Sequence, residues 1–135
     1  MQEIIKKFKI PLYGGNLNLI ITSSIRESIE SRKMDDSSID DSTEAYVSEK
    51  FDQNGGHTIF VLFNSQSISF KKRFLTIDSI AHETKHAADF IYHHRGVSDG
   101  ISNGSLNEHT AYLYGWILSS IFKVVEPIIY EDRLK

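Results

Sequence analysis

Four of the six histidines in the chain lie between Ile80 and His94, in the stretch IAHETKHAADFIYHH. His82 and His86 are four positions apart, so on a helix their imidazoles are neighbours and can bind one metal ion. Histidine is a common zinc ligand, and zinc lowers the pKa of a bound water toward about 7. Glu83 can accept a proton from that water and deliver it to a leaving amine. The pattern His-Glu-x-x-His therefore predicts a zinc centre for amide hydrolysis.

A polar helix face without a metal is the alternative interpretation of these residues. At about 100 degrees per residue, His82 and His86 lie opposite the predicted core face, together with Asp89 and His93. The predicted core face consists of Ile77, Ile80, Ala81, Thr84, Ala88 and Ile91. A polar face of this kind also occurs on ordinary amphipathic helices. The metal site is favoured because the next predicted helix carries an acidic residue that can complete it.

A catalytic zinc usually has three protein ligands and one open position, so a third ligand is needed. The candidates are Asp89, His93, Glu108 and His109. Seven residues of helix span about 10 Å, so His93 is too far away to share an ion with both His82 and His86. Asp89 has a short side chain two turns from His82, and it is better suited to orient one of the histidines.

Glu108 is the favoured third ligand. The side chains expected on its helix face are mostly small, and they are Ala111, Tyr112, Gly115 and Ser119. Small side chains permit close helix packing, which would bring Glu108 to the histidines. Two alternatives stay open. Ser105 and Glu108 fit a capping box, in which Glu108 bonds to the backbone, and His109 is the second choice of ligand or a donor to the tetrahedral intermediate.

Tyr112 follows Glu108 by one helical turn on the same face. A tyrosine hydroxyl in that place can stabilise an oxyanion, so Tyr112 is a candidate catalytic residue. The alternative is a packed aromatic side chain whose hydroxyl has a hydrogen-bond partner.

Composition predicts a single globular domain over residues 1–135, because 40% of the residues are hydrophobic and 24% are charged. The absence of cysteine excludes disulfides, thiolate zinc sites and a cysteine nucleophile. A net charge of −3 without a basic block predicts no nucleic-acid partner. No apolar run approaches the roughly 20 residues of a membrane span, and the first residues do not form a secretion signal. A cytoplasmic location without a membrane partner is therefore expected.

Strands are predicted in the first half of the chain. Residues 9–22 favour extended structure with a turn or bulge at Gly14-Gly15. Residues 44–51 and 58–63 favour two antiparallel strands, because Asn54-Gly55-Gly56 between them is a hairpin signal. A short helix is predicted over residues 25–33, and a loop rich in Asp and Ser over residues 34–42.

Two long helices are predicted in the second half. The first has Thr76 as its N-cap, runs to about His94 and stops at Gly96. The second runs from about Leu106 to Val124 and ends before Pro127. Strands followed by helices predict an α+β fold with helices packed on a small sheet.

The sequence His82-Glu83-Thr84-Lys85-His86, followed by Asn107-Glu108-x-x-Ala111, resembles the gluzincin branch of the zincin metallopeptidases. The stretches IAHETKHAADFI and NEHTAYLYGWI are also similar to small zincin-like proteins encoded by bacteriophages and prophages. The similarity is sharp over residues 76–117, about a third of the chain. It implies a zinc-dependent peptidase in which His82, His86 and Glu108 bind the metal and Glu83 is the general base.

The resemblance also implies a minimal zincin-like fold: a small, twisted, mostly antiparallel sheet packed on two long helices that carry the metal site. An edge strand, either residues 57–63 or residues 44–51, would lie over the cleft and pair with an extended protein or peptide substrate. The chain is far shorter than well-studied gluzincins and lacks their second subdomain. If it is phage-encoded, the expected location is the host cytoplasm. The oligomeric state is not indicated.

Two other functions fit the same residues. The chain could be a non-catalytic phage or host interaction protein that keeps a structural zinc, or a zinc hydrolase acting on cell-wall peptides or a small amide. Glu83 favours catalysis, because a purely structural zinc needs no general base. The lack of a secretion signal argues against the cell-wall substrate.

Overall fold

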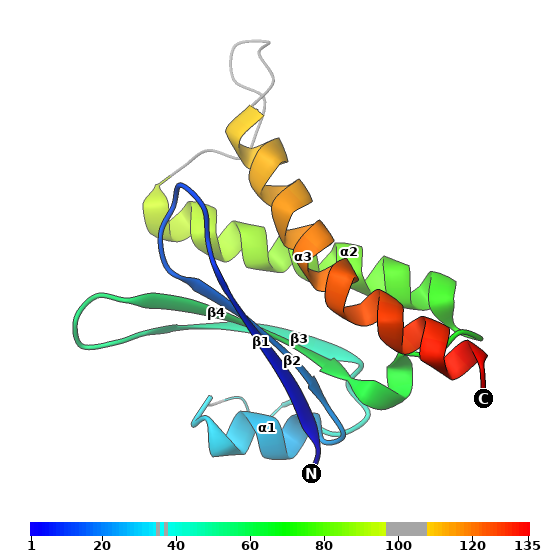
Figure 1. Ribbon diagram of the computed structural model, residues 1–135. Helices are drawn as coiled ribbons and strands as arrows, with labels where there is room; N and C mark the ends of the chain where they lie inside the picture. Colours follow the sequence, from blue (N-terminus) through cyan, green and yellow to red (C-terminus); the bar gives the residue numbers. More distant parts are fainter. Residues whose placement is uncertain (35, 37, 97–107) are drawn as a thin grey trace.

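The computed structural model describes residues 1–34, 36, 38–96 and 108–135 (Figure 1). These residues form a four-stranded mixed sheet and three α-helices, so the predicted α+β class is confirmed. The strands are β1 (Glu3–Lys9), β2 (Asn16–Thr22), β3 (Ala45–Phe51) and β4 (His57–Asn64). The helices are α1 (Ile25–Ser31), α2 (Arg73–Arg95) and α3 (Glu108–Arg133), and a 3-10 turn η1 (Ser65–Ser67) follows β4.

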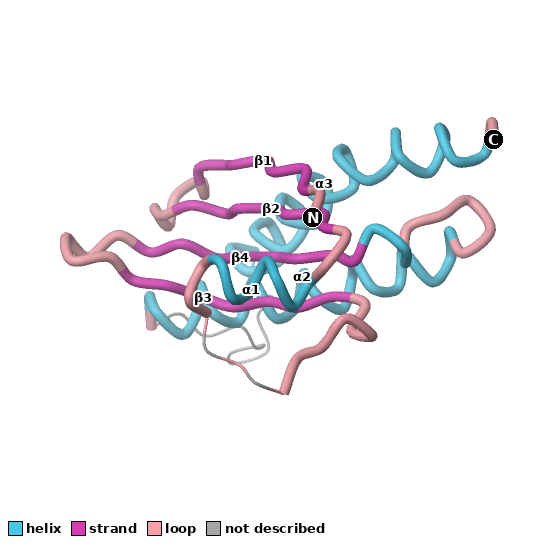
Figure 2. The backbone as a smooth tube through the Cα atoms, turned by 90° about the horizontal axis from the view of Figure 1, so that it is seen from below, coloured by secondary structure: helices cyan, strands magenta, loops and turns pink. Residues whose placement is uncertain are grey.

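The strand order is β1-β2-β4-β3, so β1 and β3 are the edges of the sheet (Figure 2). β1 pairs with β2 and β3 pairs with β4 in antiparallel fashion, while β2 and β4 are parallel. Because β4 is paired on both sides, the expectation that residues 57–63 could supply a free substrate-binding edge is wrong. Of the two strands proposed for that role, only β3 has an unpaired side.

Helices cover both faces of the sheet. α2 and α3 lie on one face, and the short α1 lies on the other (Figures 1 and 2). Successive side chains of a strand point to opposite faces of the sheet, so the central strands contribute to two cores. Leu19 and Val61 join the core under α2 and α3, while Ile20 and Leu62 pack with α1. The sheet is therefore apolar on both sides at its centre.

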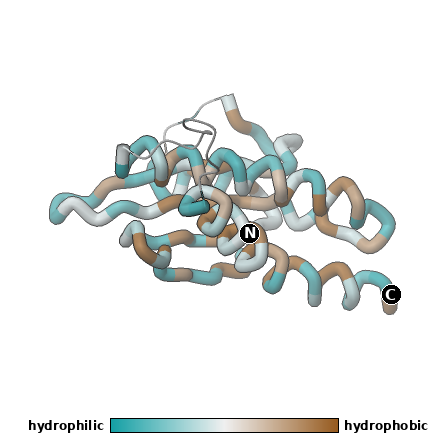
Figure 3. Tube along the Cα trace, turned by 90° about the horizontal axis from the view of Figure 1, so that it is seen from above, coloured by the Kyte–Doolittle hydropathy of each residue, from teal (hydrophilic) through white to brown (hydrophobic). Residues whose placement is uncertain are grey.

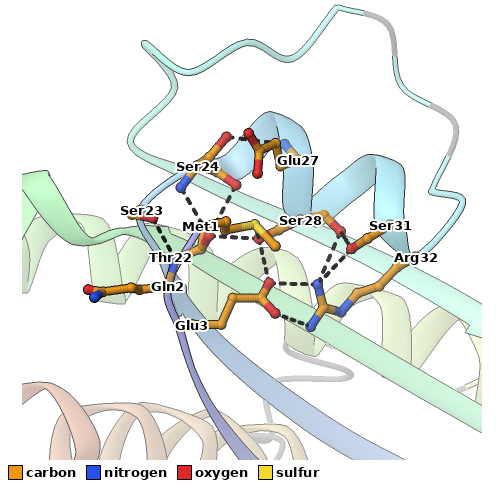
Figure 4. A network of polar contacts seen from close by, with 10 residues as sticks. All are labelled: Met1, Gln2, Glu3, Thr22, Ser23, Ser24, Glu27, Ser28, Ser31 and Arg32. Atoms are coloured by element: carbon orange, nitrogen blue, oxygen red, sulfur yellow. Dashed lines mark hydrogen bonds and ion pairs between the residues drawn. The ribbon is translucent and has the colours of Figure 1, made fainter.

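Strand β1 was missed in the sequence, and the extended segment predicted over residues 9–22 also contains the turn between β1 and β2. The pairs Ile4-Ile5 and Lys6-Lys7 do not alternate in polarity, so they hide the period of two. The strand is held at its start by Glu3 (Figure 4), which accepts hydrogen bonds from Arg32 at 2.7 and 3.0 Å and from Ser28 at 2.5 Å. These contacts lower the pKa of Glu3, with the Arg32 hydrogen bond as the largest cause.

The structure confirms the predicted short helix, α1, and the predicted hairpin of β3 and β4. Ser24 is the N-cap of α1, and its hydroxyl accepts a hydrogen bond from the Glu27 amide. Gly55 has a φ of 82°, a left-handed conformation that favours glycine in the hairpin turn. Positions 35 and 37 of the predicted Asp- and Ser-rich loop lie outside the described residues.

Helix α2 begins earlier than predicted. Its N-cap is Lys72, so the prediction of Thr76 as N-cap is wrong. Thr76 is buried within the first turns, where its hydroxyl donates to the carbonyl oxygens of Lys72 and Ser67, at 3.2 Å each. The end of the helix is confirmed, because Gly96 caps it in the left-handed conformation.

Helix α3 continues through Pro127 to Arg133, so the predicted end before Pro127 is wrong. Proline removes one backbone donor, the one that would otherwise bond to the carbonyl four residues earlier. Buried contacts on both sides of this break hold the helix, from Val125 and Ile129. In addition, Asp132 accepts a hydrogen bond at 2.8 Å from the amide of Phe70, just before α2. The predicted start at Leu106 and the Ser105 capping box lie outside the described residues.

By length and composition, α3 is the one helix among the described residues that is apolar enough to cross a membrane. Polar and apolar residues alternate along it (Figure 3), and Leu113, Ile117 and Ile121 are buried in the main core. In this helix 33% of the apolar window is buried, and one such helix is weak evidence for a membrane span.

Candidate active site

The two motif histidines lie side by side on the exposed face of α2. Their Nε2 atoms are 3.1 Å apart, and the rings are nearly perpendicular. Two imidazole nitrogens on one tetrahedral zinc lie about 3.3 Å apart, given a Zn–N distance of about 2.0–2.1 Å. The same separation also suits an N–H of one ring donating to the other ring. His82 and His86 therefore fit the imidazole half of a zinc site with little rearrangement.

Glu83 is largely buried beside the histidine pair. The residue is 8% exposed, and its carboxylate lies 4.0 Å from His82 Nε2. It accepts no hydrogen bond within the part of the chain that the structure describes. Burial raises the pKa of Glu83, and the two nearby histidines offset part of this rise. A largely buried carboxyl with a raised pKa, next to two imidazoles, has the character of a proton acceptor.

A groove runs between the edge strand β3 and helix α2, and Glu83 lies within it. One part of the groove is a hollow of about 620 Å³ lined by residues that include Glu44, Asp78, His82 and Glu83. An adjoining hollow of about 300 Å³ is lined by residues that include Val47, His86 and Phe90, together with the same His82 and Glu83. The motif thus lies at the junction of the two hollows.

The outer backbone edge of β3 has no partner strand among the described residues. Glu44 accepts a hydrogen bond from the Asn64 amide at 2.8 Å, so bonding to β4 falls on the even-numbered residues of β3. The backbone groups of Ala45, Val47 and Glu49 consequently point away from β4. They form a row of unpaired donors and acceptors with which an extended peptide can pair.

Glu108 is exposed at the first position of α3, and the packing expected to bring it to the histidines does not occur. The small-residue face predicted to pack is exposed, and it comprises Ala111, Tyr112, Gly115 and Ser119. Helix α3 instead buries Thr110, Leu113 and Ile117. Among the described residues, no three His, Asp or Glu side chains are grouped to hold a metal ion. Glu108 and its alternative His109 therefore stay predictions as the third ligand.

Tyr112 is 70% exposed and does not line the groove. It borders a different hollow on the outer face of α3, with Gly115 and Trp116. The tyrosine of α3 that contacts the motif helix is Tyr114, whose hydroxyl donates to the Ala81 carbonyl oxygen at 3.0 Å. The structure therefore does not bring Tyr112 to His82, and its catalytic role stays a prediction.

The remaining polar side chains of α2 have other roles. Asp89 pairs with Lys85 at 2.7 Å, which is not the predicted orienting contact with a histidine. His93 is exposed, as its place on the polar face predicts. His94 contacts the rings of His57 and Phe51 next to the turn of the hairpin. Partial desolvation and the neighbouring His57 lower the pKa of His94.

The core face of α2 is rotated from the predicted one. Ile77, predicted to be in the core, is 47% exposed, and Ala81 is only partly covered. Glu83 and Ala87 are buried instead, because α2 contacts both the sheet and α3. The sequence period alone does not show that α2 packs against two partners, the sheet and α3. Packing against both buries a wider arc of the helix surface.

Sequence reasoning missed Glu44 and Asp78, two acidic residues that line the larger hollow. Asp78 is four residues before His82, so the helical period could have placed it on the same face. Glu44 precedes the strand β3, and only the packing of that strand on α2 brings it to the motif. No protein-family model, curated protein or solved structure matches the chain.

Proposed function

We propose that this protein is a zinc-dependent, metallopeptidase-like hydrolase that cleaves a peptide bond of a protein or peptide substrate. The single observation that carries the proposal is the arrangement of Glu83 beside the histidine pair. The Nε2 atoms of His82 and His86 are 3.1 Å apart, and the buried carboxylate is next to them in a groove along an unpaired strand.

In this proposal β3 positions the substrate. An extended peptide pairs with the outward backbone groups of Ala45 and Val47, which places one of its peptide bonds over the junction of the two hollows. Glu83 accepts the proton of the attacking water and then donates it to the leaving amine. The burial of most of its side chain and its position next to the two histidines suit Glu83 for this exchange.

Zinc is the implied cofactor, and His82 and His86 would hold it. When bound, zinc supplies Lewis acidity and lowers the pKa of water. Glu108 is the proposed third protein ligand and His109 the alternative, because both belong to the same end of α3. The resemblance to gluzincins supports Glu108. A cytoplasmic location, in a host cell if the protein is phage-encoded, belongs to the same proposal.

The environment of Glu83 favours catalysis over a purely structural zinc. A structural site needs no carboxylate that is 8% exposed and without a hydrogen bond from any described residue. Such a group destabilises the fold, which is a common property of functional sites. For this reason we favour a hydrolase over a non-catalytic interaction module.

The test combines metal content with cleavage of a degenerate peptide library. Wild type and His93→Ala are expected to bind about one zinc per chain by elemental mass spectrometry, and His86→Ala is expected to lose it. His93 is the matched control, because it is an exposed histidine of the same helix. Glu83→Gln should keep the metal and lose at least about a hundredfold in cleavage rate.

Two results would contradict the proposal. One is wild-type protein that takes up no zinc even after zinc is added. The other is unchanged cleavage by Glu83→Gln, which would show that Glu83 is not the base. Zinc content of Glu108→Ala and of His109→Ala separately decides the third ligand: the variant that loses the metal carried it.

A further inference from the structure

We propose that the open half of the sheet face that carries α1 binds a single-stranded nucleic acid. This surface lies across the sheet from α2 and its histidine motif, so the inference does not depend on the proposed hydrolase (Figures 1 and 2). The sequence predicted no nucleic-acid partner because it contains no basic block. The cations that carry the inference are Lys7, Lys9 and Lys50, and only the pairing of the strands brings them to one surface.

Helix α1 covers only part of its face of the sheet. Ile20 and Leu62 are buried against α1. Two positions earlier in the same central strands, Asn18 and Phe60 are only partly buried, whereas their neighbours that point to the other face are fully buried. The hairpin of β3 and β4 extends beyond α1 (Figures 1 and 2). This half of the face is therefore open.

The strand register sets two rows of four side chains on the open surface. Residues that are directly opposite each other on paired strands point to the same face. One row consists of Lys7, Asn18, Phe60 and Ser48, and the next consists of Lys9, Asn16, Thr58 and Lys50. These eight side chains include three cations and no carboxylate. The surface is therefore basic, in a chain whose net charge is −3.

The cations of the two rows are not neutralised by the described chain. None of them forms an ion pair with a described residue, and Lys50 donates only to the carbonyl oxygen of Arg32. The carboxylate of Asp52, in the adjoining turn, accepts hydrogen bonds from two amides of that turn. Lys7 and Lys9 lie on one edge strand and Lys50 on the other, about 14 Å away at about 4.8 Å per strand spacing. A chain of phosphates that crosses the sheet can reach both edges, whereas a single phosphate cannot.

Asn18 gives a second, independent indication of a ligand. Among the described residues, its Oδ1 is the one buried side-chain nitrogen or oxygen without a hydrogen-bond partner. Such an atom in a folded protein calls for an explanation. The side chain lies between Lys7 and Phe60 in its row. A phosphodiester has no donor for this acceptor, but the amino groups of nucleobases are donors.

Phe60 supplies the aromatic ring of the surface. It packs partly against the α1 cluster and is partly exposed. Single-stranded nucleic acids bind proteins through bases stacked on aromatic rings and phosphates held by cations. Lys7, Asn18 and Phe60 thus offer one group each for the phosphate, the polar edge and the ring of a nucleotide. A lipid headgroup or an acidic peptide would match the lysines, but neither brings a base to stack on Phe60.

The test measures binding by fluorescence anisotropy. The probes are two labelled twelve-nucleotide single strands of one mixed sequence, one RNA and one DNA. The logarithm of the affinity is expected to fall with the logarithm of salt concentration at a slope of about −2, because about three phosphates are neutralised at about 0.7 each. Binding of either strand supports the proposal, and a preference for RNA would indicate contact with the 2′-hydroxyl.

Two double variants test the lysines. Lys7→Gln with Lys50→Gln is expected to lower the affinity at least about tenfold and to reduce the slope to about −0.7. Lys71→Gln with Lys123→Gln is the matched control, and it should bind as wild type. It removes the same charge from two exposed lysines outside the rows, one just before α2 and one on α3.

Two uncharged positions test recognition of the base. Phe60→Leu keeps an apolar contact with α1 but removes the ring, so the affinity should fall at least about fivefold at an unchanged salt slope. Asn18→Ala should also weaken binding without changing the slope, because it removes no charge. A thermal melt checks the folding of each variant, and either one alone is sufficient for the test.

Four results would overturn the proposal. The first is no measurable binding of either strand at about 50 mM salt, where phosphate contacts are strong. The second is equal affinity of the two double lysine variants. The third is unchanged oligonucleotide binding by folded Phe60→Leu and Asn18→Ala, with heparin bound equally well, which would show attraction of anions alone. The fourth is binding to phosphatidylserine vesicles but not to the oligonucleotides, which would assign the lysines to a lipid surface.

Discussion

The charged carboxylate of Glu83 destabilises the folded protein at neutral pH. The side chain is largely buried on α2, and burial raises the pKa of its carboxyl above the usual 4.5. The folded protein therefore binds the proton more tightly than the unfolded chain does. The stability that Glu83 contributes is fully present below pH 4.5, and it is lost as the pH rises through the folded-state pKa.

Glu83→Gln is consequently expected to stabilise the metal-free protein at pH 7. The gain should be on the order of 1 kcal/mol, because the amide removes the desolvation penalty of a buried charge. The difference between variant and wild type should shrink as the pH falls below about 4.5, where the wild-type carboxyl is protonated. Chemical denaturation of both proteins across this pH range measures it.

The matched control is Glu131→Gln, an exposed carboxylate near the end of α3. It should change the stability little at any pH, because its charge is solvated in both states. A Glu83→Gln protein that is less stable than wild type at pH 7 would contradict the account. It would mean that the carboxylate contributes a favourable contact to the folded protein.

At the scale of elements, the packing of β3 on α2 places the histidine motif in a groove. The hairpin places β3 at the edge of the sheet, and residues of β3 line the groove together with residues of α2. Val47 pairs with Val61 at a position where its backbone N–H points away from β4, while Ser48 points its N–H toward β4. A change at Val47 therefore tests pairing with the substrate, and a change at Ser48 tests pairing with β4.

Val47→Pro is expected to leave the sheet folded and to remove a donor needed by the substrate. In the Glu83→Gln background, peptide affinity should fall by about tenfold, because one backbone hydrogen bond and its alignment are lost. Fluorescence titration with a labelled, acetylated hexapeptide and a thermal melt measure the two effects. Ser48→Pro is the control and should destabilise the protein by about 3 kcal/mol, since it breaks a ladder bond.

Unchanged peptide affinity in a folded Val47→Pro protein would contradict pairing along β3. In that case the peptide would have to be held by the hollows alone. A loss of folding equal to that of Ser48→Pro would instead place the Val47 amide in the bond pattern with β4.

At the scale of the whole molecule, the proposed metal site is coupled to the stability of the domain. His82 and His86 lie on a helix that is buried against both the sheet and α3, so unfolding removes their alignment. Any ligand that binds only the folded state stabilises it by mass action. The effect should reach about 2.7 kcal/mol when free zinc is one hundred times its dissociation constant.

Addition of zinc is therefore expected to raise the melting temperature of the wild-type domain by several degrees, and a chelator should reverse the rise. The double variant His82→Ala with His86→Ala should melt at the same temperature with and without zinc. His93→Ala should behave as wild type. A rise that persists in the double variant would move the metal site elsewhere, and a wild type unaffected by zinc would contradict the coupling.

Local patterns in the sequence were enough for the α+β class, the hairpin at Gly55, the end of α2 at Gly96 and the shared exposed face of His82 and His86. Each of these depends on residues close together in the chain, where periodicity and turn chemistry act directly. The association of a carboxylate with the two histidines is likewise local, because Glu83 belongs to the same helical turn.

Only the tertiary structure decided which features surround that motif. The parallel pairing of β2 with β4, the strand β1, and the position of β3 at the edge depend on partners distant in sequence. The same is true of Glu44, which reaches the groove through strand packing, and of Pro127, which is tolerated because buried contacts hold α3 on both sides of it. The physical reason is common to all of them. Burial is set by the whole set of neighbours, and a linear pattern shows which residues are apolar but not which partner will cover them.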